Sequence, residues 1–115
     1  DLIKEFTGAK YALLTNNGTL ALYLSMTAMG IKKEDEVIVP DFTFNASASS
    51  VHFAGGKPIF VDVCENTFNI DVTKIEKLIT NKTKAIMPVH IYGQAADMDP
   101  IIELAKKYNL KTAFQ

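Results

Sequence analysis

The fold is decided by the stretch Thr15-Asn16-Asn17-Gly18-Thr19-Leu20-Ala21-Leu22. The apolar run Tyr11-Ala12-Leu13-Leu14 leads into it, and apolar residues at helical spacing follow it. This order predicts a strand at residues 11–15, a polar turn, and a helix over residues 17–29. Amides in the first turn of a helix lack intrahelical partners, and the helix dipole favours an anion there. The turn is therefore a candidate phosphate site.

Two interpretations of this turn compete. Gly18 allows an oxygen to approach the backbone closely, and the Thr19 hydroxyl can donate a further hydrogen bond to a phosphate. In the alternative, Asn17 only caps the helix and Asn-Gly only makes a turn. Spacing alone favours the capping interpretation, because short motifs often match by chance. The rest of the chain changes that balance.

Strands and helices are predicted to alternate along the whole chain. The predicted strands after the first lie at residues 36–39, 58–63, 83–90 and 110–114, and the other helices at residues 1–6, 45–53, 71–79 and 99–108. Such alternation is typical of parallel strands joined by right-handed crossovers. We therefore predict an α/β fold of three layers in one domain, residues 1–115, with a mostly parallel sheet and helices on both faces. Leu20, Leu24 and Ala28 recur every fourth residue and are assigned to a buried helix face; Phe60 and Tyr92 are assigned to the core.

Composition excludes several classes of protein. The chain has 115 residues and a formal net charge of −1, which gives no reason to expect nucleic acid or a membrane as partner. No apolar run approaches the roughly 20 residues that span a bilayer, and the N-terminus is not a signal peptide. Cys64 is the single cysteine, so a reducing cytoplasm is expected. The two histidines, His52 and His90, lie far apart, and we expect no metal site.

Three loops are predicted at the carboxyl edge of the sheet, where open α/β sheets bind ligands. They are residues 16–19, residues 41–45 with Phe42 and Phe44, and residues 90–94. A phosphate site beside an exposed aromatic ring suits a nucleotide or pyridoxal phosphate (PLP). The glycine-rich fingerprints of dinucleotide-binding domains and of P-loops are both absent, which argues against a Rossmann-like oxidoreductase.

Several blocks of the chain resemble a known family. They are Asn17-Gly18-Thr19-Leu20-Ala21-Leu22, Asp35-Glu36-Val37-Ile38-Val39-Pro40, Thr43-Phe44-Asn45-Ala46-Ser47-Ala48, Gly56-Lys57-Pro58-Ile59-Phe60-Val61-Asp62-Val63, Thr83-Lys84-Ala85-Ile86-Met87-Pro88-Val89-His90-Ile91-Tyr92-Gly93-Gln94 and Ala96-Asp97-Met98-Asp99-Pro100. In order and spacing they are similar to the PLP-dependent nucleotide-sugar aminotransferases of the DegT/StrS type, and most similar to the perosamine-synthase branch. The resemblance runs from Phe6 to about Lys111.

The resemblance implies a fold, a cofactor site and a reaction. The fold is the large domain of the aspartate-aminotransferase (type I) class, of which this chain would be the N-terminal part. Gly18 and Thr19 would bind the PLP phosphate, with Asn17 where the family more often has serine, and Phe44 would stack on the pyridine ring. The reaction would move an amino group from glutamate to a nucleotide-linked keto sugar, for surface-polysaccharide or secondary-metabolite sugars, in a homodimer.

The resemblance also places residues beside the substrate. Phe42 and His90 would lie near the substrate pocket, although the simpler interpretation of His90 is a strand-end residue with a satisfied hydrogen bond. Asp62 and Asp97 could be taken for catalytic acids, but turn and cap roles are the simpler interpretation.

The chain departs from the family at residues 110–115. There the family strand runs into a Glu-Asp pair whose aspartate holds the pyridine nitrogen, whereas this strand ends Ala113-Phe114-Gln115. None of Lys82, Lys84, Lys106 and Lys111 matches the family's Schiff-base lysine. We therefore expect a fragment with no catalytic residue of its own, inactive alone and prone to self-association. Two alternatives stay open: a sugar dehydratase of the same family, and a non-catalytic phosphate-binding or assembly module.

Overall fold

The protein is built on one parallel sheet. The computed structural model describes residues 2–115. Its strands are β1 (Glu36–Pro40), β2 (Lys57–Val61), β3 (Thr83–Ile86) and β4 (Lys111–Thr112), in the order β2-β1-β3-β4. All three strand pairs are parallel. The pairing continues beyond β4, because the Gln115 amide donates a 3.2 Å hydrogen bond to the Pro88 carbonyl.

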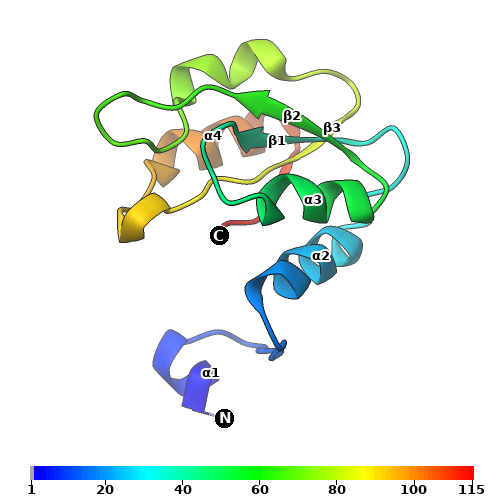
Figure 1. Ribbon diagram of the computed structural model, residues 1–115, viewed down its shortest axis with the longest axis vertical. Coiled ribbons are helices and arrows are strands. Elements are labelled where there is room, and N and C mark those ends of the chain that lie inside the picture. Colours follow the sequence, from blue (N-terminus) through cyan, green and yellow to red (C-terminus); the bar gives the residue numbers. More distant parts are fainter. Residues whose placement is uncertain (1) are drawn as a thin grey trace.

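Helices cover both faces of this sheet (Figure 1). α2 (Gly18–Ala28) and α3 (Ala46–Phe53) lie on one side, and α4 (Met98–Tyr108) lies on the other. The central strand β1 shows why: Val37 and Val39 belong to the core under α2 and α3, whereas Ile38 belongs to the core under α4. A strand buried on both faces is apolar throughout, as in other parallel sheets. The predicted three-layer α/β fold is confirmed.

The Ala- and Ser-rich helix α3 packs closely against the sheet, as its composition predicts. Ala46, Ser47, Ser50 and Val51 are all buried. Nearby, Gly56 lies so close to its neighbours that a Cβ atom there would be 2.5 Å from the Ile31 side chain.

Two predicted elements are shorter or tighter than expected. Residues 71–79 form two 3-10 turns, Val72–Lys74 and Glu76–Leu78, instead of one α-helix. Asp71 caps the first turn as predicted, and amides here donate to carbonyls three residues back. β3 ends at Ile86, four residues earlier than predicted, because Pro88 has no amide to continue the strand pairing.

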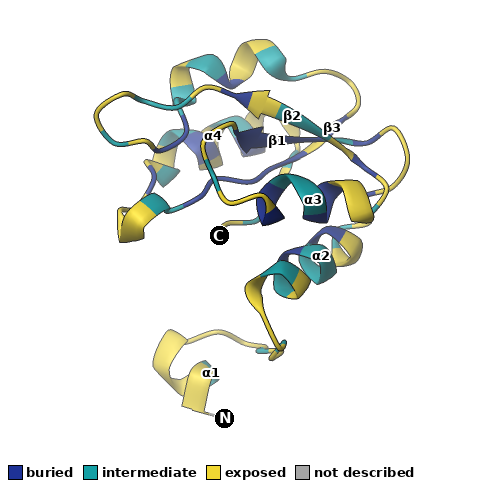
Figure 2. Cartoon of the chain, viewed as in Figure 1, coloured by how far each residue is buried: buried dark blue, intermediate teal, exposed yellow. Residues whose placement is uncertain are grey.

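The predicted strand at residues 11–15 is wrong. α1 (Leu2–Thr7) forms as expected and is followed by Gly8 in the left-handed conformation (φ 70°). The residues after it are extended but pair with none of the four strands, and Tyr11, Leu13 and Leu14 are 76–81% exposed. Figure 2 shows this N-terminal segment as exposed and set apart from the sheet. An extended segment becomes a strand only beside another strand, and this one has no such neighbour in residues 2–115.

The predicted buried face of α2 is also wrong. The buried residues are Leu22 and Met26, whereas Leu20 and Ala28 are exposed. α2 is apolar on most of its circumference, so sequence periodicity could not select the face that meets α3. Phe60 and Tyr92, assigned to the core, are 53% and 81% exposed. Among the described residues, no helix has the length and apolar character needed to cross a membrane.

Candidate functional site

The first turn of α2 presents donors that nothing in the described chain uses. Asn17 caps the helix: its side-chain oxygen accepts a 2.8 Å hydrogen bond from the Leu20 amide. Thr15 holds the turn by donating from its hydroxyl to the Asn17 carbonyl at 2.8 Å. The amides of Gly18 and Thr19 come first in the helix and have no carbonyl one turn back. No hydrogen bond from either amide to another group is present within residues 2–115.

The space above Gly18 is open. A Cβ atom built there would meet nothing within 4 Å, and the φ angle of Gly18 is not in the left-handed range. Neither packing nor backbone conformation therefore requires glycine at this position. Open space beside two unused amides and the half-buried Thr19 is the arrangement that suits a phosphate oxygen.

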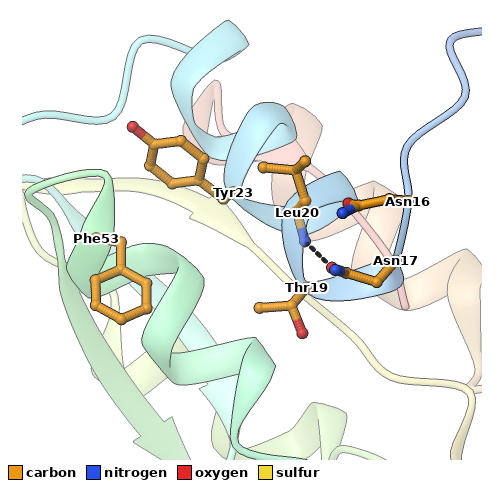
Figure 3. Close-up of a pocket in the computed structure, with 6 residues that line it drawn as sticks. All are labelled: Asn16, Asn17, Thr19, Leu20, Tyr23 and Phe53. Carbon is orange, nitrogen blue, oxygen red and sulfur yellow. Dashed lines mark hydrogen bonds between the residues drawn. The ribbon is translucent and has the colours of Figure 1, made fainter.

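A pocket opens along α2 from this turn (Figure 3). It has a volume of about 590 Å³ and is lined by Asn16, Asn17, Thr19, Leu20, Tyr23 and Phe53. Its polar end is the first turn of α2, and its apolar side lies between Tyr23 and Phe53, the last residue of α3. Of the residues selected from the sequence, Asn17 and Thr19 line this pocket, whereas Gly18, Phe42, Phe44 and His90 do not.

The aromatic residues of the 41–45 loop have different surroundings. This loop follows β1 at the carboxyl edge of the sheet and leads into α3, which begins on the same side of the molecule as α2 (Figure 1). Phe44 is 70% exposed, so its ring is accessible to a ligand. Phe42 instead packs against Phe68 and Tyr92, with ring centroids 5.3 and 6.4 Å away.

His90 has a hydrogen-bond partner. Its Nδ1 atom accepts a 3.0 Å bond from the Ala96 amide, and its ring lies 5.7 Å from that of Phe114. Because Nδ1 is the acceptor, the neutral ring carries its proton on Nε2. Nδ1 is therefore used in a hydrogen bond within the protein, which leaves Nε2 as the ring nitrogen free to bond to a ligand.

Two surface ion pairs join separate segments of the chain. Asp62 pairs with Lys74, and the hydrogen bond from Lys74 is the main reason that the pKa of Asp62 lies below its usual value. A hydrogen bond from the Val63 amide lowers this pKa further. Lys107, followed by Tyr108, lowers the pKa of Glu76 and ties the second 3-10 turn to α4. Asp62 is thus occupied in a surface ion pair, which fits the turn role given to it from the sequence.

Two polar residues at the carboxyl edge were missed by sequence reasoning. The Ser47 hydroxyl donates a 2.6 Å hydrogen bond to the side chain of Gln115, which anchors the end of the chain to the start of α3. Asn69 is buried and bonds to the loop that contains His90. Both sets of contacts join residues at least 22 positions apart, so spacing in the sequence carries no signal for them.

Comparison with known proteins identifies the family. The profile of the DegT/DnrJ/EryC1/StrS aminotransferase family matches residues 1–113. The chain belongs to this family. Among curated relatives, GDP-perosamine synthase of Caulobacter vibrioides is 56% identical over 106 residues, and GDP-perosamine synthase of Escherichia coli O157:H7 is 52% identical over 106 residues. These alignments cover 92% of this chain and 29% of each relative, so the chain spans less than a third of their length.

Solved structures agree with this assignment. An aminotransferase from Psychrobacter cryohalolentis is 45% identical, with a TM-score of 0.94 over 98% of this chain and 29% of that one. NtdA from Bacillus subtilis, solved with its cofactor PMP (pyridoxamine phosphate) bound, is 40% identical, with a TM-score of 0.95 over 97% of this chain and 26% of that one. The fold is therefore that of PLP-type aminotransferases.

Proposed function

We propose that this chain supplies the phosphate-binding part of a PLP site. The Gly18 and Thr19 amides and the Thr19 hydroxyl would hold the phosphate, and the exposed ring of Phe44 would stack on the pyridine. The observation that carries the proposal is the pair of unused amides beneath open space at the first turn of α2. Family membership and the PMP bound in NtdA support the choice of cofactor. When bound, PLP stabilises the carbanion formed during amino transfer.

The reaction we propose is amino transfer from glutamate to a nucleotide-linked keto sugar, in a homodimer. Relatives named GDP-perosamine synthase and UDP-2-acetamido-2-deoxy-3-oxo-D-glucuronate aminotransferase support a nucleotide-sugar substrate. Phe42 and His90 would lie on the substrate side. The Phe42 ring packs against two other aromatic rings, and Nε2 of His90 is available as a donor.

We further propose that residues 1–115 do not catalyse transamination by themselves. Two of the lysines have other partners: Lys82 pairs with Glu34, and Lys111 donates to the Met29 carbonyl. At the end of the last strand, the side chain of Gln115 is an amide that accepts a hydrogen bond from Ser47, and not a carboxylate that could hold a pyridine nitrogen. Turnover of a keto-sugar nucleotide by this chain with PLP and glutamate would refute this part of the proposal.

The cofactor proposal is tested by titration with PMP. PMP lacks the aldehyde of PLP, so it cannot form Schiff bases with surface lysines. Pyridoxamine, which differs only by lacking the phosphate, is the matched control ligand. We expect PMP to bind at least about tenfold more tightly, because hydrogen bonds to a charged group contribute about 1.5–3 kcal/mol each. Equal affinities for the two ligands would show that no phosphate site is present.

A further inference from the structure

A short turn connects two of the three loops at the carboxyl edge. It follows β2 and spans residues 64–69. The Cys64 amide donates to the Asn69 carbonyl at 2.9 Å, and the Phe68 amide donates to the Cys64 carbonyl at 2.8 Å. Val63 and Ile70 close it with an antiparallel bridge. The turn is therefore a rigid unit held by its own backbone.

Asn69 links this turn to the loop of residues 90–95. Its Nδ2 atom donates to the carbonyls of Gln94 and Ala95 at 3.1 and 3.2 Å, and its Oδ1 atom accepts from the Ile91 amide at 3.2 Å. Asn69 is only 5% exposed. Both donor hydrogens and the acceptor oxygen of the Asn69 side chain thus bond to one loop. Burial of a side-chain amide costs free energy unless its hydrogen bonds are satisfied, and here they are.

Phe68, beside Asn69, reaches the other loop. Phe68 and Tyr92 both have positive φ angles, 57° and 54°, which are rare for bulky residues and unfavourable without outside support. Both of their rings pack on Phe42. The support for Tyr92 comes from Asn69, which bonds to the residue before it and to the carbonyls after Gly93.

We propose that Asn69 is a positioning residue of the candidate site. It fixes the 90–95 loop, so that Tyr92 and Phe68 hold the Phe42 ring between them and His90 keeps its orientation. Asn69 acts through these residues and does not touch the ligand. The role on substrate rests on the proposed function, which places Phe42 and His90 on the substrate side.

The first test is amide hydrogen exchange of the Asn69→Ala variant. Asn66→Ala is the matched control, because Asn66 is exposed on the same turn. We expect the Ile91 amide to exchange at least about tenfold faster in Asn69→Ala, with β1 amides unchanged, because only the local tie is lost. If the β1 amides exchange faster by the same factor, the substitution lowers overall stability and has no local effect. If exchange of the Ile91 amide is unchanged, Asn69 does not hold the 90–95 loop. Either result overturns the inference. Asn69→Leu, which keeps a similar side-chain shape but has neither donor nor acceptor, decides by the same criteria if Asn69→Ala does not fold, and failure of both variants to fold also overturns it.

The second test separates substrate from cofactor. The probes are PMP and N-(5′-phosphopyridoxyl)-L-glutamate, which adds the amino-acid part to the same cofactor. We expect Asn69→Ala to leave the Kd for PMP within about twofold and to weaken binding of the glutamate adduct by about fivefold or more, since only the adduct carries the amino-acid part that would extend toward the positioned rings. Equal changes for both probes, or no change, would overturn the positioning role. If the unmodified chain binds neither probe, the proposed function fails, whereas the exchange measurement still decides whether Asn69 holds the loop.

Discussion

Replacement of Gly18 by alanine should separate ligand binding from folding. The added Cβ atom would meet nothing within 4 Å, and the backbone of Gly18 is not in the left-handed range. Where the backbone suits both residues, Gly→Ala stabilises a protein by about 0.4–1 kcal/mol, because the unfolded chain loses freedom. The free energy of unfolding of Gly18→Ala should therefore be unchanged or slightly higher.

Ligand affinity should move in the opposite direction. The methyl group would occupy the space where a phosphate oxygen approaches the Gly18 and Thr19 amides. Loss of one hydrogen bond to a charged group costs about 1.5–3 kcal/mol, which raises Kd by about 10- to 150-fold. Thr19→Val, which replaces the hydroxyl with a methyl group of similar size, should weaken PMP binding by a similar factor.

The assay pairs a urea unfolding curve with a PMP titration on each variant, and pyridoxamine serves as the ligand control. We expect the PMP preference over pyridoxamine to shrink in Gly18→Ala while the unfolding midpoint holds. PMP binding that survives Gly18→Ala unchanged would refute the phosphate site at this turn. A large loss of stability would refute the structural argument that the space above Gly18 is open.

Three further predictions concern stability and association. Gly56→Ala should lower the free energy of unfolding by about 1–3 kcal/mol in urea titrations, because its Cβ would clash with Ile31 2.5 Å away. Lys74→Met should lower stability at neutral pH, and its difference from the unmodified chain should vanish on acidification. The pKa of Asp62 is lowered from 3.8 in the folded state, so the contribution is present above pH 3.8 and is lost as pH falls through the folded pKa; a difference that persists in acid would contradict this. The apolar side chains exposed in residues 2–14 should cause concentration-dependent self-association in sedimentation velocity, and a monomer at all concentrations would count against it.

The elements that sequence reasoning placed correctly are those whose signal is local. Gly8 ends α1, Asn17 caps α2 and Asp71 caps a helical turn. The strand predicted at residues 11–15 is wrong because its formation depends on a distant partner. An extended segment becomes a strand only when another strand pairs with it.

The sequence by itself determined the parallel α/β order, the turn at Asn17–Thr19 and the family. These follow from propensity, capping and motif order, which are properties of neighbouring residues. Only the tertiary structure decided which face of α2 is buried, that Phe42 packs with Phe68 and Tyr92, and that Asn69 ties the 90–95 loop. Those contacts join residues 22 to 50 positions apart, and their partners are selected by the packing of the sheet and not by any local pattern.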